Sequence, residues 1–165
     1  PYYITTPILM HLLALDVDFA NITVMMQKEV ASRLTAEPRS KDYGSLSIAV
    51  QNTMDVEVAF IVNRNSFIPA PNVDSAIVVL KKRAEPVAAI SDQKAFDKLV
   101  KGSFASRRKT LWNNLIRLYG KAPAAKESIT AALEASAIKP SQRAEELSIT
   151  QFAELQKNLQ RQGLL

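Results

Sequence analysis

The feature that most constrains the fold is a change of pattern near residues 84–91. Before it, short apolar runs alternate with helical patterns, whereas after it the strand patterns disappear. Strands that alternate with helices are typical of an α/β layer with a largely parallel sheet. A segment that has helical periodicity and no strand pattern is predicted to form a small all-helical domain. We therefore expect an α/β domain over residues 1–84 and a helical domain over residues 91–165.

Three strands are expected in the first domain. The first is predicted to be buried, and the other two are nearly continuous in apolar residues, as in strands covered on both faces. They alternate with three short helices, the first opened by the cap-and-proline pair Thr6-Pro7. The connection between the last two strands is too short for a comfortable crossover, so the last strand should run antiparallel to its neighbour. Three strands alone would expose an apolar edge, so we expect the chain to be part of a longer protein. The strands are expected over residues 21–27, 56–62 and 76–80, and the helices over residues 6–15, 28–35 and 45–53.

Three helical segments are expected in the second domain. In the first of them, Phe96, Leu99, Val100 and Phe104 share one face. The apolar stripe continues beyond a basic triplet through Leu111, Leu115 and Leu118. The second and third segments are expected over residues 123–135 and 149–160.

Composition excludes several kinds of chemistry. The chain has no cysteine, which excludes disulfides, a thiol nucleophile and a thiolate metal site. His11 is the single histidine and lies in an apolar run, so we assign it a structural or helix-surface role and predict no metal site. No apolar run is long enough to span a membrane, and the first residues lack the features of a signal peptide. A reducing cytoplasm is the expected compartment.

The net charge of +5 is concentrated in the second domain. Between residues 98 and 126 every charged residue is basic: Lys98, Lys101, Arg107, Arg108, Lys109, Arg117, Lys121 and Lys126. Such a run is often only a solvated face, but a long stretch of one sign also favours a polyanionic partner. Nucleic acid fits, because each neutralised phosphate releases counterions and adds affinity.

Six short motifs follow one another along the chain. Each of them is weak alone, but their order and spacing together are specific. They are Pro1-Tyr2-Tyr3-Ile4-Thr5-Thr6-Pro7, the segments 27–34 and 43–47, the proline-rich run 67–76, the residues from Phe104 to Leu115, and the segment 140–148. Together they resemble the KsgA-type ribosomal RNA adenine dimethyltransferases over essentially all 165 residues. Pro1 and Tyr2 match the end of that family's Asn-Leu-Pro-Tyr motif.

This resemblance implies the C-terminal half of a Rossmann-like class I methyltransferase sheet followed by a small helical domain. It also implies transfer of methyl groups from S-adenosylmethionine to two neighbouring adenosines near the 3′ end of small-subunit ribosomal RNA. Such a base must leave its stack and be held flat. Pro1, Tyr2 and Phe67 are the catalytic-site residues that the resemblance assigns here, with the two aromatic rings packing against the base. No acid–base residue is obligatory.

The cofactor half of the family pattern is missing from the 165 residues. The Asn and Leu of the motif and the upstream glycine-rich loop would precede Pro1. The four glycines, Gly44, Gly102, Gly120 and Gly163, form no nucleotide-binding loop. We therefore predict no cofactor-binding residue in this chain and expect that it cannot methylate alone, whereas the parent enzyme would bind S-adenosylmethionine.

Eight basic residues are predicted to contact RNA backbone on the basis of charge and position. Arg143 has an alternative role, an ion pair with Glu145 or Glu146. Two other functions stay open: a non-enzymatic module for RNA binding or ribosome assembly, and a related resistance methyltransferase of large-subunit RNA. The eight residues are Lys28, Arg33, Arg39, Lys41, Arg107, Arg108, Lys109 and Arg143.

Overall fold

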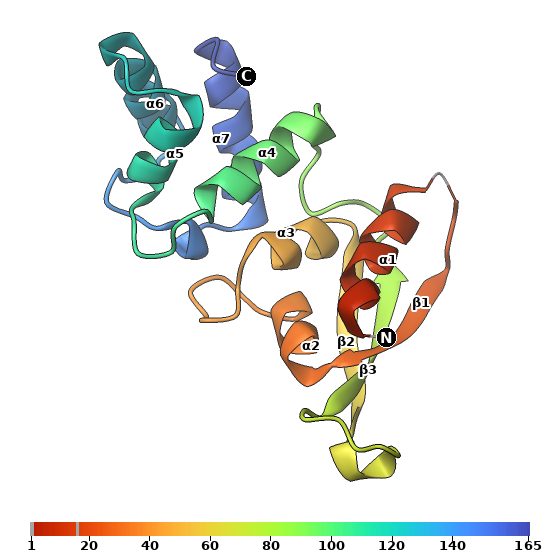
Figure 1. The fold of residues 1–165 in the computed structure, drawn as a ribbon. Coiled ribbons are helices and arrows are strands. Elements are labelled where there is room, and N and C mark those ends of the chain that lie inside the picture. Colours follow the sequence, from red (N-terminus) through yellow and green to blue (C-terminus); the bar gives the residue numbers. More distant parts are fainter. Residues whose placement is uncertain (1, 16) are drawn as a thin grey trace.

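The computed structural model describes residues 2–15 and 17–165 (Figure 1). A first lobe (residues 2–82) contains α1 (Tyr2–Ala14), β1 (Asn21–Gln27), α2 (Lys28–Leu34), α3 (Ser45–Gln51), β2 (Met54–Val62) and β3 (Ser75–Lys82), with a 3-10 turn at Arg64–Ser66. A helical lobe (residues 93–161) contains α4 (Gln93–Ser103), α5 (Leu111–Tyr119), α6 (Pro123–Ala135) and α7 (Ile149–Arg161), with a 3-10 turn at Ala144–Glu146.

The described sheet has the order β1-β3-β2, and both pairings are antiparallel. Val78 of β3 lies between Val24 and Val58. The antiparallel course of the last strand is confirmed. The largely parallel sheet expected from the alternation of elements is wrong for the described strands. β1 and β2 do run in the same direction, but the chain returns from β2 and inserts β3 between them.

One face of the sheet carries the core of the first lobe. Met26, Val78 and Leu80 are fully buried there and pack with Leu9 of α1 and Leu34 of α2, among others. On the opposite face Phe60 is 59% exposed. The sequence-based expectation that both faces are covered is therefore wrong for these strands in the described part of the chain.

Helix α1 begins four residues earlier than the Thr6-Pro7 pair predicted, at Tyr2. Pro7 therefore lies inside the helix rather than at its first position. The fixed backbone angle of proline suits a helix, and at this place its missing N–H removes one backbone hydrogen bond near the helix start. Because the helix begins earlier than predicted, Tyr2 is its first residue.

The apolar stripe predicted as one helical segment is divided into α4 and α5 by the loop of residues 104–110 (Figure 1). Thr110 caps α5, because its hydroxyl accepts the N–H of Asn113 at 3.3 Å. Buried Asn114 braces the loop by donating to the carbonyls of Ser103 at 2.8 Å and Ser106 at 3.1 Å. The basic triplet Arg107-Arg108-Lys109 thus lies on a braced loop and not on a helix face.

The second core contains side chains from both lobes. Ala36, Tyr43 and Ile48 of the first lobe pack among the buried residues of α4, α5, α6 and α7. The Tyr43 hydroxyl donates to the buried carbonyl of Leu147 at 2.9 Å, and its ring meets that of Phe104 edge-on. Burial raises the pKa of the Tyr43 phenol well above its ordinary value. The two lobes are therefore packed directly against each other.

Candidate functional site

Tyr2 is attached to the end of the sheet at which β3 begins. Its hydroxyl and the hydroxyl of Ser75 share a hydrogen bond. Ser75 is fully buried and pairs with Gln27 of β1 and Val62 of β2. Because both neighbouring strands run antiparallel to β3, their carboxyl ends meet the amino end of β3 at this edge. Tyr2 therefore lies where β1 and β2 end. Pro1 lies outside the described residues.

Phe67 lies on the connection between β2 and β3, a loop of residues 63–74 that returns to this same edge of the sheet (Figure 1). It follows the 3-10 turn, and its side chain is half-buried. The two aromatic residues predicted to hold a base thus come from separate segments, α1 and the 63–74 loop, at one end of the sheet.

The 63–74 loop is closed at its base by Arg64 and Asp74. The backbone N–H of Arg64 donates to Asp74 Oδ1 at 3.0 Å, and the guanidinium Nε donates to the same oxygen at 3.2 Å. Arg64 Nη1 also donates to the carbonyl of Asn72 at 2.7 Å. The hydrogen bonds from Arg64, the backbone one first, lower the pKa of Asp74 from its ordinary value. Asp74 is therefore a carboxylate at neutral pH, and the loop is held as a closed unit.

Lys28 and Arg33 lie on α2, beside this edge. Lys28 is exposed at the helix start, and its N–H donates to the carbonyl of Asp74 at 3.0 Å, which ties α2 to the base of the 63–74 loop. Arg33 pairs with Glu29 one turn earlier, with a nitrogen–oxygen distance of 2.6 Å. Besides the hydrogen bonds from Arg64, the charge of Lys28 helps to lower the pKa of Asp74, while the exposed Lys28 side chain could still contact a phosphate. The charge of Arg33 is partly neutralised by Glu29 within the helix.

Arg107 joins the two lobes. Its guanidinium forms an ion pair with Glu145 at 2.8 Å and also donates to the carbonyl of Lys41. The N–H of Arg39 donates to the carbonyl of Glu145 at 2.7 Å. Arg107 and the backbone of Arg39 and Lys41 are therefore engaged in holding the 37–43 loop against the helical lobe.

These contacts bring five of the predicted RNA-binding residues together. The side chains of Arg39 and Lys41 are exposed on one loop, and those of Arg108 and Lys109 on the braced loop beside it. Arg143 is also exposed; its N–H donates to Glu146 Oε1 at 2.7 Å. No ion pair joins the Arg143 side chain to Glu145 or Glu146 in the described part of the chain, and Glu145 pairs with Arg107 instead.

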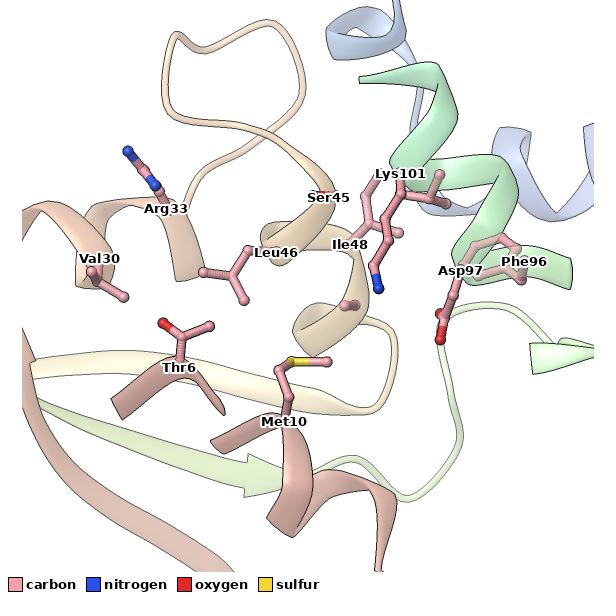
Figure 2. A pocket seen from close by; sticks show the side chains of 12 residues that line it. Thr6, Met10, Val30, Arg33, Ser45, Leu46, Ile48, Phe96, Asp97 and Lys101 are labelled. Atoms are coloured by element: carbon pink, nitrogen blue, oxygen red, sulfur yellow. The ribbon is translucent and has the colours of Figure 1, made fainter. Parts of the chain in front are cut away.

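A pocket of about 460 Å³ lies between α1, α2, α3 and α4, where the lobes adjoin (Figure 2). Met10, Leu46 and Val100 contribute to its largely apolar wall. Lys101 and Asp97 point toward it from α4, whereas the Arg33 side chain points away (Figure 2). Among the predicted site residues that the structure describes, only Arg33 lines this pocket.

Sequence reasoning missed the residues that hold these groups in place. Ser75, Arg64, Asp74 and Glu145 position the predicted ones through side-chain hydrogen bonds. Asp74 and Ser75 lie inside the proline-rich motif and could have been flagged there. Glu145 was named only as a partner of Arg143, and its actual partner Arg107 lies 38 residues away. Arg64 carries no local signal, because its partner Asp74 is 10 residues away. Among the described residues no group of three or more His, Cys, Asp or Glu side chains could hold a metal ion, and no helix is long and apolar enough to cross a membrane.

The order of the motifs agrees with a comparison against known families. The sequence profile described as ribosomal RNA adenine dimethylase matches residues 1–161. The chain belongs to this family. The resemblance to KsgA-type enzymes is thereby confirmed.

Named relatives of this dimethylase family point the same way. Ribosomal RNA small subunit methyltransferase A of Ligilactobacillus salivarius (strain UCC118) is 57% identical over 164 residues, which is 99% of this chain and 55% of that protein. The protein of the same name from Streptococcus pneumoniae (strain CGSP14) is 54% identical over 99% of this chain and 57% of its own length. The chain therefore spans little more than half of these relatives.

Two solved structures confirm the expected methyltransferase-type α/β fold followed by helices. A dimethyladenosine transferase from Plasmodium falciparum has a TM-score of 0.81 at 27% identity, covering 99% of this chain and 65% of that one. The 23S rRNA methyltransferase ErmE has a TM-score of 0.62 at 26% identity, covering 97% of this chain and 62% of that one. The dimethyladenosine transferase shares more of the arrangement.

Proposed function

We propose that this chain is the base-holding and RNA-binding part of an enzyme that dimethylates two adjacent adenosines near the 3′ end of small-subunit ribosomal RNA. The methyl donor would be S-adenosylmethionine, bound by a part of the parent protein outside the 165 residues. The partner would be the immature small ribosomal subunit in the cytoplasm. Residues 1–84 would belong to the methyltransferase domain, and residues 91–165 would form the RNA-binding domain.

The observation that carries the proposal is the attachment of Tyr2 to Ser75. It fixes one aromatic ring at the end of the sheet to which the 63–74 loop brings Phe67. An adenine amino group is a poor nucleophile, because its lone pair is delocalised into the ring. An enzyme must therefore extrude the base, hold it flat and orient its amine. Two aromatic side chains at one edge could do this by stacking, which contributes roughly 1–3 kcal/mol per base.

The basic loops would supply affinity for RNA without reading its sequence. Arg39, Lys41, Arg108, Lys109 and Arg143 expose their side chains where the lobes meet. Phosphate contacts of this kind fix the register of a nucleic acid relative to the protein. Arg107 would mainly hold the 37–43 loop against the 104–110 loop, because its guanidinium pairs with Glu145 and donates to the carbonyl of Lys41.

The test is transfer of labelled methyl groups from S-adenosylmethionine to small subunits that lack the modification. We would compare this chain alone with a chimera in which the missing half of the Ligilactobacillus salivarius relative precedes it. We expect label in small-subunit RNA with the chimera and none with the chain alone, whose glycines form no cofactor loop. Label in large-subunit RNA would instead favour the resistance-methyltransferase function.

A non-enzymatic RNA-binding module is the second candidate, and the basic loops favour it. That function requires binding to small subunits but no methyl transfer by the chimera. It also gives no reason for an aromatic side chain on the 63–74 loop at the Tyr2 edge. Substituting Phe67 with alanine would leave such a module unaffected, whereas it would impair a methyltransferase.

A further inference from the structure

Ile68, at the tip of the 63–74 loop, is the most exposed large apolar side chain among the described residues. Its relative exposure is 101%, so it is as open to water as in an unfolded chain. Burying such a side chain is favourable, and here the fold gains none of that stabilisation. Single exposed apolar residues are common. What distinguishes Ile68 is how rigidly the loop presents it.

Three hydrogen bonds from Arg64 close the loop, two to Asp74 and one to Asn72. The Asn63 side chain also caps the 3-10 turn, because it accepts the N–H of Asn65 at 2.9 Å. The two prolines that follow Ile68, Pro69 and Pro71, each fix one backbone angle. A tip held in this way loses little conformational freedom when it binds a partner.

Ile68 and Phe67 face different surroundings although they are neighbours in the chain. The backbone of Phe67 is extended, with φ −118° and ψ 149°. Successive side chains of extended backbone point to opposite sides. This matches the burial, because Phe67 is half-buried and Ile68 is open to solvent. A ligand held by Phe67 would therefore have Ile68 on the far side of the loop.

We propose that Ile68 is a wedge that enters the gap left in an RNA stack when the target adenosine is extruded. The inference rests on the proposed function of this edge. Extrusion costs unstacking energy, and apolar side chains inserted between bases are a known way to offset it. RNA is favoured over a protein partner because the exposed Lys28, a cation suited to a phosphate, adjoins the base of the loop.

The experiment uses the 165-residue chain and an RNA stem–loop with two adjacent adenosines in the loop, one replaced by 2-aminopurine. The fluorescence of 2-aminopurine rises when the base leaves its stack, and the anisotropy of an end label reports binding separately. We expect Ile68→Ala to reduce the fluorescence rise at saturation by about fivefold or more, because a wedge that has lost most of its apolar atoms no longer offsets the cost of unstacking. Ile68→Leu should restore it. Val87→Ala, which shortens another exposed apolar side chain outside the loop, is the matched control.

Each other outcome overturns the proposal in a recognisable way. Absence of RNA binding at low salt removes the proposed RNA function and the wedge together. Binding with no fluorescence rise, or with an equal rise in Ile68→Ala, removes the wedge and leaves RNA binding intact. If Ile68→Ala leaves both RNA signals unchanged but weakens binding to protein-containing small subunits, the tip contacts protein instead.

Discussion

Arg107 and Glu145 form an ion pair of 2.8 Å between loops that the sequence separates by 38 residues. The same guanidinium donates to the carbonyl of Lys41, and the carbonyl of Glu145 accepts from Arg39. Two residues of the helical lobe therefore hold a loop of the first lobe. A basic residue that looks like a nucleic-acid contact in the sequence thus has a structural function as well.

Arg107→Ala should lower the free energy of unfolding by about 1 kcal/mol, since the pair is half exposed but is supported by a further hydrogen bond. Urea denaturation followed by circular dichroism measures this. Arg117→Ala removes an exposed arginine from α5 of the same lobe and should change stability little. Equal effects of the two substitutions would show that the pair does not couple the loops.

Arg108→Ala should weaken RNA binding without affecting stability, because its side chain is exposed on the braced loop. Loss of one phosphate contact should reduce the slope of log K against log salt by about 1. Fluorescence anisotropy titrations between low and moderate salt give this slope. Lys139→Ala removes the same charge outside the loops, and an identical change in its slope would mean that the position of the charge is irrelevant.

Tyr43→Phe should destabilise the chain by about 1–2 kcal/mol, because it leaves the buried carbonyl of Leu147 without the hydroxyl that now donates to it. Tyr3→Phe removes a hydroxyl from a residue that is 83% exposed and should be neutral. Thermal unfolding compares the two. A neutral Tyr43→Phe would indicate that water or another group replaces the bond.

The Arg64–Asp74 contact should open under acid. Its partners lower the pKa of Asp74 in the folded chain, so the contact adds stability above the ordinary value of 3.8. That stability is lost as pH falls through the folded pKa, which lies below 3.8. The amide resonance of Arg64, which donates to this carboxylate, should titrate there in NMR spectra. The titration should vanish in Asp74→Asn; an Arg64 amide that is flat in both chains contradicts the contact.

In the chimera, Tyr2→Ala should reduce methyl transfer by roughly 5- to 150-fold, the range that corresponds to 1–3 kcal/mol of base stacking. Tyr2→Phe and Ser75→Ala keep the ring and remove only its attachment, so each should cost less than Tyr2→Ala. Tyr3→Ala, on the exposed side of α1, serves as the control. If Tyr2→Ala were as active as Tyr3→Ala, the ring would have no part in holding the base.

The sequence patterns predicted the helices and strands well where neighbouring residues determine the secondary structure. β1 and α6 have the predicted bounds, and the other strands lengthen by one or two residues at their ends. The periodicity across the basic triplet wrongly predicted one helical segment. The apolar stripe continues from α4 to α5, but the two helices are separated by a loop that the Asn114 side chain holds through hydrogen bonds. The start of α1 was also missed, since proline commonly marks the first turn of a helix, whereas Pro7 lies inside α1, five residues after its start.

The candidate site was predictable only in part. Tyr2, Phe67 and the exposed basic residues could be named from motifs and charge, and their proposed roles stay predictions. The residues that fix them could not, because the bonds Tyr2–Ser75 and Arg107–Glu145 span 73 and 38 residues. Sequence periodicity carries no information about such pairs, which exist only once each lobe has folded.

The placement of Ala36, Tyr43 and Ile48 in the core of the helical lobe has a consequence for modularity. The four C-terminal helices do not enclose a complete interior of their own, because the neighbouring lobe supplies part of it. Exchanging them between family members would therefore require exchange of the loop that carries Tyr43. Recombination at the junction near residues 83–92 would separate side chains that pack as one interior.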